Sequence, residues 1–323
     1  MWEWFLIIGA LATPMPEVAN LSHGYYKPYF YWMFPILVAN EEGIFEEEGV
    51  SLRIHDIVSG GQPEDKANWY KDALDAGSRD FYFCCAWQGV YSTCATGRGR
   101  IGAGLRSTLI KTFAIYSKPD SGFENVLDIA KRGTSIAVNK NADAHYVTLK
   151  NLSEFISEDR IKFAHLGGVE KCFKALINDE VEVATLAGPY AEAAEAIGYR
   201  RLLPLSRTEP TFVVLEEHVN EKVAKSFFKS LNGAVELING GREKYRQRYL
   251  REFSDVIDKY LPEISGDKKS ILSKVRLPVW APVEPVTRNE FNEIQSFLVE
   301  KGLSVEGRNF DSTVESVINA TSS

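Results

Sequence analysis

The sequence has 323 residues, of which 45% are hydrophobic and 25% charged, and its formal net charge is −7. The length is sufficient for two domains of ordinary size, and the composition is that of a globular protein. The negative charge argues against nucleic acid as the main partner, because phosphate binding requires a basic surface.

The apolar run at the N-terminus, Trp2–Ala12, is shorter than the roughly 20 apolar residues of a membrane span. It has no Lys or Arg before it, and Glu3 has the wrong charge for a signal peptide. We therefore predict a strand at Trp4–Ala10 and a cytoplasmic protein without a membrane span. The alternative is an exported protein in which residues 1–19 act as a degenerate signal.

A loop, a helix, a turn and a strand follow. The loop Thr13–Pro28 is long, and long loops in compact domains often carry function. Apolar residues at three- and four-residue spacing predict a helix from Phe30 to Glu41 with one apolar face. Gly43 suits the left-handed residue that ends such a helix, and alternating apolar residues predict a strand over Val50–Ile54.

The next part of the chain alternates between strands and helices. The predicted strands are Asp80–Ala86, Arg98–Leu105, Thr112–Ser117, Ser135–Asn139, Lys162–Leu166, Val181–Leu186, Leu202–Leu205 and Thr211–Leu215. The predicted helices are Glu64–Ala76, Val90–Thr96, Phe123–Lys131, Asp143–Phe155, Gly168–Asn178 and Pro189–Ile197. This order predicts an α/β fold with mostly parallel sheets and helices on both faces.

From Val219 onward the sequence is mainly helical. We predict helices at Val219–Leu237, Arg242–Phe253, Asp255–Pro262, Asp267–Val275, Arg288–Lys301 and Phe310–Ile318, with a Pro-rich segment at Leu277–Pro285. The cysteines, Cys84, Cys85, Cys94 and Cys172, have no CxxC spacing, so they support neither a zinc site nor a redox motif. We expect buried free thiols, no metal and no cofactor.

Four segments resemble one known group of proteins. They are PYFYWMFPILVANEEGIFEEEGVSLRI at Pro28–Ile54, DALDAGSRDFYFCCAWQGVYSTCATGRGRIGAGLRS at Asp72–Ser107, NKNADAHYVTLKNL at Asn139–Leu152, and KALINDEVEVATLAGPYAEAAEAIG at Lys174–Gly198. In this order the chain resembles the type 2 periplasmic-binding-protein fold. Within that fold it is similar to the branch of sulfonate- and nitrate-type solute-binding proteins and fungal thiamine-pyrimidine synthases.

The resemblance implies two α/β lobes with a ligand cleft between them. Lobe I would comprise residues 1–106 and 218–323, and lobe II residues 107–217. The chain would cross between the lobes near Arg106–Thr108 and Leu215–Val219. A ligand would lie beyond the carboxyl ends of the strands, where helix N-termini point into the cleft.

His145 is the first candidate for ligand contact. It lies between Ala144 and Tyr146 in the first turn of a predicted helix, where free N–H groups and the helix dipole attract an anion. The related solute-binding proteins often have a similar His-Tyr pair facing the ligand. The alternatives are an exposed or capping histidine, and Asp143 could cap the same helix.

Other candidate residues lie at strand ends or at the crossing. Trp87 could stack on a flat ligand and Gln88 could bond its edge, although a packed core Trp is equally consistent with the sequence. Pro189 and Tyr190 hold the equivalent place in lobe II, where Pro also suits a first helical position. The remaining candidates are Arg106, Ser107 and Thr108 at the crossing, and Tyr25, Tyr26 and Lys27 on the lobe I wall.

Two enzymatic alternatives follow from the resemblance. In the thiamine-pyrimidine synthases a lysine anchors pyridoxal phosphate, a histidine follows, and a cysteine-rich cluster lies downstream. Here FCCAWQGVYS has neither Lys nor His, Gln88 stands about where the histidine would fall, and Arg207–Val219 has no cysteine. A desulfinase-type hydrolase would need a cysteine in the loop Thr13–Pro28, which has none.

These departures argue against the known chemistries and leave open whether any reaction is catalysed. We therefore predict a cytosolic small-molecule binding protein that closes on a small polar or anionic ligand, such as a pyrimidine- or phosphate-bearing molecule related to thiamine precursors. The alternatives are a biosynthetic enzyme of the thiamine-pyrimidine synthase type and an exported substrate-binding component of an ABC transporter. The sequence does not identify protein partners.

Overall fold

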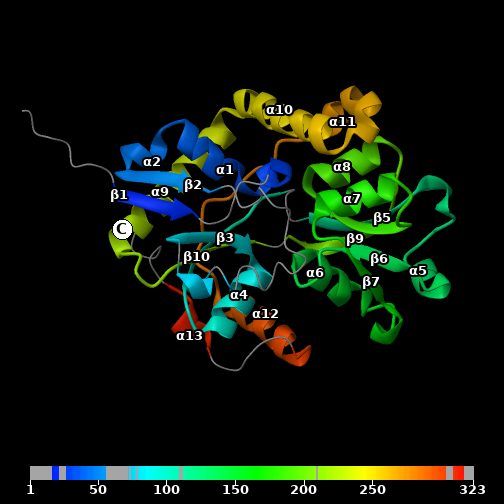
Figure 1. Ribbon diagram of the computed structural model, residues 1–323, viewed down its shortest axis with the longest axis horizontal. Helices are drawn as coiled ribbons and strands as arrows, with labels where there is room; N and C mark the ends of the chain where they lie inside the picture. The colour runs from blue at the N-terminus through cyan, green and yellow to red at the C-terminus, as the bar shows by residue number, and fades with distance from the viewer. Residues whose placement is uncertain are drawn as a thin grey trace, which may run out of the picture.

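The computed structural model describes residues 17–21, 27–55, 72, 74–77, 79–108, 112–208, 210–302 and 308–315. The predicted strand Trp4–Ala10 and most of the predicted helix Glu64–Ala76 lie outside these residues. The described strands form two five-stranded sheets. Each sheet has helices packed around it, so the molecule has two α/β lobes side by side (Figure 1).

The sheet of lobe I has the strand order β2-β1-β3-β10-β4. Its strands are β1 (Glu17–Leu21), β2 (Val50–Ile54), β3 (Phe81–Cys85), β4 (Arg100–Leu105) and β10 (Thr211–Leu215). Strand β1 runs parallel to β2 and β3, whereas β10 runs antiparallel to β3 and β4.

The sheet of lobe II has the order β7-β6-β8-β5-β9. Its strands are β5 (Thr112–Ser117), β6 (Ser135–Val138), β7 (Lys162–His165), β8 (Val183–Ala187) and β9 (Arg200–Thr208). Strand β6 is parallel to β7 and β8, and β5 is antiparallel to β8 and β9. Both sheets therefore have the same mixed pattern, in which one antiparallel strand lies next to the edge.

The helices lie around these sheets. Those of the first half are α1 (Phe30–Glu41), α2 (Ile44–Glu47), α4 (Ala86–Thr96), α5 (Leu127–Arg132), α6 (Asp143–Leu152), α7 (Val169–Ile177) and α8 (Gly188–Ala196). Those of the C-terminal part are α9 (Glu221–Gly240), α10 (Arg242–Tyr260), α11 (Lys268–Lys274), α12 (Arg288–Glu300) and α13 (Phe310–Thr313). Short 3₁₀ turns lie at Lys27–Tyr29, Pro119–Ser121, Glu158–Arg160 and Pro262–Asp267.

Helix α1 is enclosed on all sides rather than on one face. Every residue from Phe30 to Ile36 is buried, which is typical of a helix that is hydrophobic all round. Gly43 has the predicted left-handed backbone, with φ of 76°. Phe45 then folds back into the core, where its ring stacks on Phe227 with centroids 5.4 Å apart. The four cysteines are free and buried, as predicted.

Three sequence predictions need correction. The predicted loop Thr13–Pro28 is wrong over Glu17–Leu21, because parallel pairing with β2 makes this segment a strand whatever its weak local pattern. Strand β9 is longer than the predicted Leu202–Leu205 and contains Pro204, which an edge strand tolerates. Helix α10 continues to Tyr260 without the predicted break after Phe253.

The second crossing between the lobes also differs from the prediction. Strand β10 pairs within the sheet of lobe I, so the chain returns between β9 and β10 rather than at Leu215–Val219. Thr211–Leu215 therefore belongs to the sheet of lobe I. We keep the other predicted lobe boundaries as a proposal.

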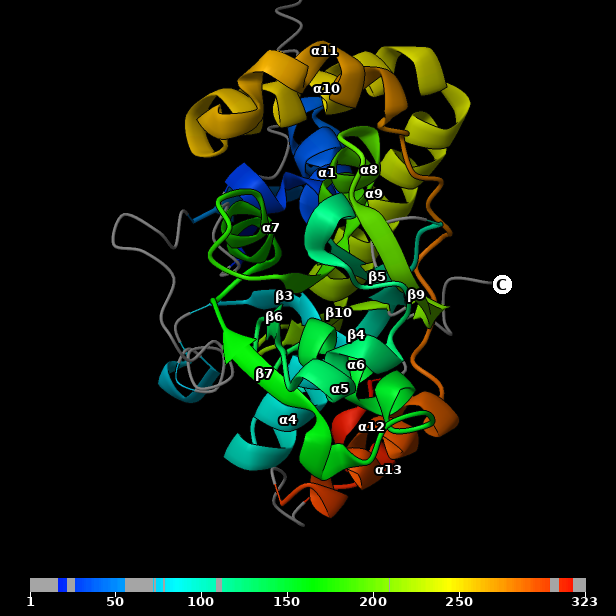
Figure 2. The ribbon, with the colours of Figure 1, turned by 90° about the vertical axis from the view of Figure 1, so that its right-hand side faces the viewer.

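The C-terminal helices touch both lobes. Helix α10 packs on α1 of lobe I and α11 packs on α8 of lobe II, above both sheets in Figure 1. An extended segment, Arg276–Glu284, then leads to α12, which packs on α4 of lobe I. Figure 2 shows this segment, here called the strap, as the orange coil that runs from α11 down to α12.

Candidate ligand site between the two lobes

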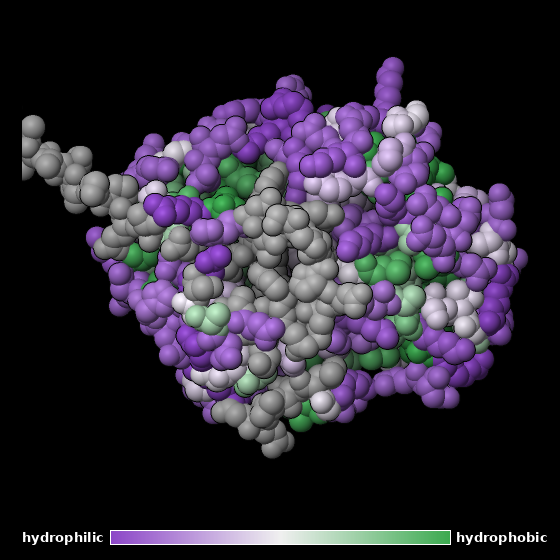
Figure 3. All heavy atoms as spheres, viewed as in Figure 1, coloured by the Kyte–Doolittle hydropathy of each residue, from purple (hydrophilic) through white to green (hydrophobic). Residues whose placement is uncertain are grey.

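Helix N-termini from both lobes meet at the interlobe face. Helix α4 follows β3 in lobe I, and α6, α7 and α8 follow β6, β7 and β8 in lobe II. The carboxyl ends of parallel strands share one edge of a sheet, and ligands of open α/β sheets bind there. Hydrophilic residues cover most of the described part of the face seen in Figure 3, as is usual for side chains in contact with water. The polar side chains considered below are unusual because they are buried.

Trp87 and Tyr146 meet across the interlobe face. Trp87 of α4 lies against Tyr146 of α6, with ring centroids 5.0 Å apart. Phe297 of α12 packs edge-on against the same indole at 5.3 Å. The sequence predicted both Trp87 and Tyr146 as ligand contacts. The structure brings them together, and protein rings cover the indole from two sides.

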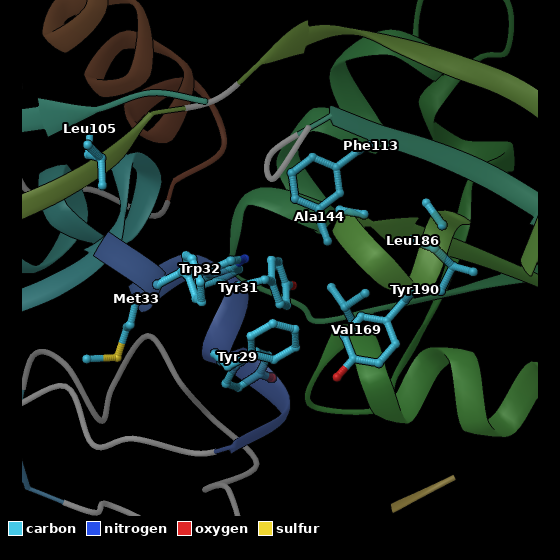
Figure 4. Close-up of a cluster of buried hydrophobic side chains, with 14 of the residues drawn as sticks. Tyr29, Tyr31, Trp32, Met33, Leu105, Phe113, Ala144, Val169, Leu186 and Tyr190 are labelled. Carbon is cyan, nitrogen blue, oxygen red and sulfur yellow. The ribbon is translucent and has the colours of Figure 1, made fainter. Parts of the chain in front are cut away.

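A second aromatic contact joins the lobes at the start of α1. Tyr31 lies edge-on to Tyr190 of α8, with centroids 5.9 Å apart. The Tyr190 hydroxyl donates a hydrogen bond to the Pro28 carbonyl at 2.7 Å. Gly188 makes this approach possible, since a Cβ there would lie 2.9 Å from the Tyr31 ring. Figure 4 shows Tyr31 between the lobe I helix and the lobe II residues around Tyr190.

His145 lies at the start of α6, as predicted, but it carries no positive charge at neutral pH. Burial lowers the pKa of His145 to about 4, with smaller contributions from the charges of Lys140 and His165. Its Nδ1 accepts a hydrogen bond from the Asn141 N–H at 3.2 Å. Its ring packs edge-on against Phe163 at 4.6 Å. The histidine thus stabilises its own turn, and its contact with a ligand stays a prediction.

The residues predicted at the first crossing, Arg106–Thr108, contact the strap. Thr108 donates its N–H to the Val279 carbonyl at 3.0 Å, and its hydroxyl accepts the Val279 N–H at 3.1 Å. Ser107 forms a β-bridge with Trp280. The Arg106 guanidinium pairs with Glu290 and lies 3.9 Å from Glu284. These contacts explain the position of the three residues without a phosphate or carboxylate ligand.

Lys27 faces helix α10. Its ammonium lies 2.7 Å from Asp255 and 3.3 Å from Glu252. Burial lowers the pKa of Lys27, but the two carboxylates more than offset this effect, so the pKa is raised overall. Tyr25 and Tyr26 lie outside the described residues. Pro189 is buried in the first turn of α8, as its sequence position predicted.

Two buried carboxylates of lobe II were not among the predicted ligand contacts: the sequence analysis considered Asp143 only as a helix cap and did not consider Glu170. Asp143 opens α6, where Ala142 rather than Asp143 is the N-cap, and its Oδ1 accepts the Ala144 N–H at 2.9 Å. Glu170 lies in the first turn of α7. The exposed fraction is 2% for Asp143 and 3% for Glu170. Their signal in the sequence is an acidic residue in the first turn after a parallel strand.

Two buried amides, one from each lobe, have polar atoms without hydrogen-bond partners among the described residues. They are Gln88 Nε2 in the first turn of α4 and Asn139 Oδ1 at the end of β6. The exposed fraction is 3% for Gln88 and 6% for Asn139. Because α4 and α6 are in contact next to these residues, both amides belong to the same interlobe region. Sequence analysis found Gln88 and missed Asn139.

A separate pocket of about 80 Å³ opens in lobe II between α8 and β9. Its charged groups are already paired. Arg276 donates its N–H and its Nε–H to Glu192, and the Tyr116 hydroxyl donates to Glu195 at 2.9 Å. The interlobe region is therefore the better candidate for a ligand site.

The described residues contain no cluster of His, Cys, Asp and Glu that could hold a metal ion. In the same residues no helix is long and apolar enough to cross a membrane.

Comparisons with known proteins agree with the two-lobed architecture. No protein-family model matches the sequence, and no curated protein matches it in sequence. Similar solved structures include the aliphatic sulphonate-binding protein SsuA of Escherichia coli, with a TM-score of 0.68 at 16% identity over 93% of this chain and 97% of the other. The alkanesulfonate-binding SsuA of Xanthomonas axonopodis pv. citri, bound to MOPS, has a TM-score of 0.65 at 16% identity, covering 91% and 96%.

A third similar structure is the Candida albicans CA3427 gene product, described as having the generic periplasmic-binding-protein fold. Its TM-score is 0.56 at 14% identity, covering 94% of this chain and 96% of the other. At such identities the likeness shows the fold alone. The chain has the type 2 periplasmic-binding-protein fold, as predicted from the sequence.

Proposed function

We propose that the protein binds a small polar molecule between its two lobes and that the lobes close over it. The observation that carries this proposal is the pair of buried amides, Gln88 from lobe I and Asn139 from lobe II. A buried polar atom without a partner costs about 1–3 kcal/mol. A ligand with one acceptor and one donor would remove this cost at both amides and would link the lobes.

The architecture supports binding as the general role. Structural neighbours are solute-binding proteins of this fold, and such proteins hold ligands by hinge closure around a cleft. Gln88 stands where the resemblance to pyrimidine synthases calls for a histidine, which favours binding over that catalysis. The cytosolic location and the link to thiamine precursors stay predictions from the sequence.

Native mass spectrometry of the protein as purified tests the proposal. We expect the wild-type protein to carry a small-molecule adduct and Gln88→Leu and Asn139→Leu to lose it, because Leu has similar size but no hydrogen-bonding group. Gln247→Leu is the matched control, since this exposed amide on α10 bonds only to Glu243 among the described residues. Retention of the adduct by both cleft variants would contradict the assignment.

A wild-type protein without an adduct is then incubated with a metabolite extract and measured again. Failure of this sample to bind any compound would contradict the proposed function itself. Small-angle scattering of the same sample, with and without bound compound, measures closure, which we expect to reduce the radius of gyration.

A further inference from the structure

The pocket between α8 and β9 adjoins a wider hollow beside the strap. The inner pocket has a volume of about 80 Å³ and the outer hollow about 430 Å³. Glu192 and Glu195 of α8 and Arg276, the first residue of the strap, line both spaces. Figure 2 shows α8, β5 and β9 on the same side of the molecule as the strap. Neither Gln88 nor Asn139 lines this double pocket, so it is separate from the interlobe amides.

The inner part of the double pocket is largely apolar. Its walls include Phe113 and Ala114 of β5, Ala191 of α8 and Pro204 of β9. Phe113 is fully buried, and Ala114 and Ala191 are almost so. Burial of hydrocarbon against such walls is favourable, because it removes apolar surface from water. The inner pocket is therefore suited to a short apolar chain rather than to a charged group.

The two carboxylates of the double pocket are already neutralised by the protein. Arg276 donates its backbone N–H to Glu192 Oε2 at 3.1 Å and its Nε–H to Oε1 at 2.5 Å. The Tyr116 hydroxyl donates to Glu195 Oε1 at 2.9 Å. Arg201 Nη1 lies 3.3 Å from the same oxygen. Each carboxylate thus has one guanidinium as its counter-ion.

Positive groups with unused hydrogen-bonding capacity remain at the outer hollow. Lys274, the last residue of α11, is exposed and forms no hydrogen bond or ion pair with another described residue. The Nη1 and Nη2 atoms of Arg276 likewise have no partner within the described part of the chain. With Arg201, the lining has three cations against two carboxylates, so one positive charge is in excess. This excess is local, since the whole chain has a net charge of −7.

The Glu192 pair orients the free end of the Arg276 guanidinium. The Glu192 side chain is only 12% exposed, and it holds both the backbone N–H and the Nε–H of Arg276. The remaining Nη1–H and Nη2–H groups form a planar fork, which matches the two oxygens of a carboxylate. A carboxylate also carries the single negative charge that the lining leaves uncompensated.

We propose that the double pocket is a second ligand site, which binds a small carboxylate with a short apolar chain. The carboxylate lies against the Nη atoms of Arg276 and the ammonium of Lys274, and the chain enters the inner pocket beside Ala191. This site goes beyond the proposed function, because its ligand contacts lobe II and the strap rather than the interlobe amides.

Four compounds test the charge and the chain separately. They are pentanoate as the anion, pentan-1-ol as the neutral analogue, pentylammonium as the cation, and acetate as an anion without the chain. Binding to the dialysed full-length protein is measured by saturation-transfer NMR titration at pH 7 and constant low ionic strength, because salt screens exposed charges. We expect pentanoate to bind at least about tenfold more tightly than each of the other three, equivalent to about 1.4 kcal/mol.

Two charge reversals on α11 then locate the anion. We expect Lys274→Glu to weaken pentanoate binding by at least about tenfold, because it places a like charge beside the carboxylate. Lys269→Glu is the matched control, since Lys269 is exposed on the same helix and does not line the double pocket. It changes the net charge equally, and we expect binding to change less than about twofold.

A third variant locates the apolar chain. Ala191→Val adds two methyl groups to the wall of the inner pocket, and we expect it to weaken pentanoate binding by at least about threefold. Circular dichroism melting curves confirm that the variant is folded. If it does not fold, the charge reversals at the exposed Lys274 and Lys269 still decide the assignment.

The outcomes separate this inference from the proposed function. Equal binding of pentanoate and pentan-1-ol, no pentanoate binding, or equal effects of Lys274→Glu and Lys269→Glu would each overturn the second site and leave the interlobe site intact. Pentanoate binding that Gln88→Leu removes and Lys274→Glu does not would also overturn it, because the anion would then bind between the lobes. Retention of pentanoate by Gln88→Leu and Asn139→Leu supports two distinct sites.

Discussion

The strap and the interlobe region around Gln88 and Asn139 differ in how their amide groups are paired, although the strap also has one buried polar atom, Trp280 Nε1, without a partner among the described residues. Backbone groups of the strap find partners in Asn239, Asn232, Arg242 and the crossing strand, including two bonds between Asn239 and Trp280. In the cleft, Gln88 and Asn139 have buried polar atoms without partners among the described residues. Satisfied groups stabilise a fold, whereas unsatisfied buried groups mark a place where a ligand can contribute.

The largest expected effect comes from breaking the strap. Trp280 is buried and stacks on Phe34 with centroids 5.7 Å apart. We expect Trp280→Ala to lower the free energy of unfolding by about 4 kcal/mol, as loss of a buried aromatic ring does. Urea denaturation measures this change. A loss below about 1 kcal/mol would show that packing of the Trp280 ring on Phe34 contributes little to stability, and the exposed neighbour Val279→Ala serves as the control.

The second largest effect is expected from acidification, which should lower the free energy of unfolding through protonation of His145. The folded-state pKa of His145 is about 4, below its unfolded value of about 6.5, so the unfolded chain binds more protons between these values. The contribution of His145 to stability is therefore complete above pH 6.5 and is lost as pH falls toward 4, by about 3 kcal/mol. Denaturation curves of wild type and His145→Asn across this range check the effect. Equal pH dependence in both proteins would refute it.

A smaller effect is expected at the contact between Tyr31 and Gly188. A Cβ at Gly188 would lie 2.9 Å from the Tyr31 ring, and the backbone there has φ of +58°. We expect Gly188→Ala to destabilise the protein by about 2 kcal/mol and to favour an open arrangement. Small-angle scattering should show a larger radius of gyration than for wild type.

Gly198→Ala separates the clash from the backbone strain. Gly198 also has a left-handed backbone, with φ of +89°, but a Cβ there would meet no atom within 4 Å. We expect this variant to lose about 1 kcal/mol by strain alone and to keep the compact shape. Equal scattering profiles for the two variants would rule out the proposed interlobe clash.

Much of the fold follows from local patterns, which is why the sequence predicted it. Fully apolar runs such as Phe81–Cys85 predict buried strands, and Gly43 marks the end of α1. Strand β1 escaped prediction because pairing with β2 and β3, rather than its own residues, determines its conformation.

The site was less predictable than the fold. Trp87 and His145 were recognised at strand ends, but their sequence positions do not reveal that protein rings cover one and that burial neutralises the other. Tyr31 lies in an unbroken apolar run, so nothing local distinguishes it from core residues. Its contact with Tyr190 of lobe II depends on how the lobes pack, and this is a long-range property.

The most direct test of the account is a crystal structure of the protein as purified, with the region between Gln88 and Asn139 examined for electron density. We predict a small organic molecule within hydrogen-bond distance of Gln88 Nε2 and Asn139 Oδ1, in contact with both lobes. A direct bond of these amides to the protein or to water molecules alone, with no organic molecule between the lobes, would contradict it.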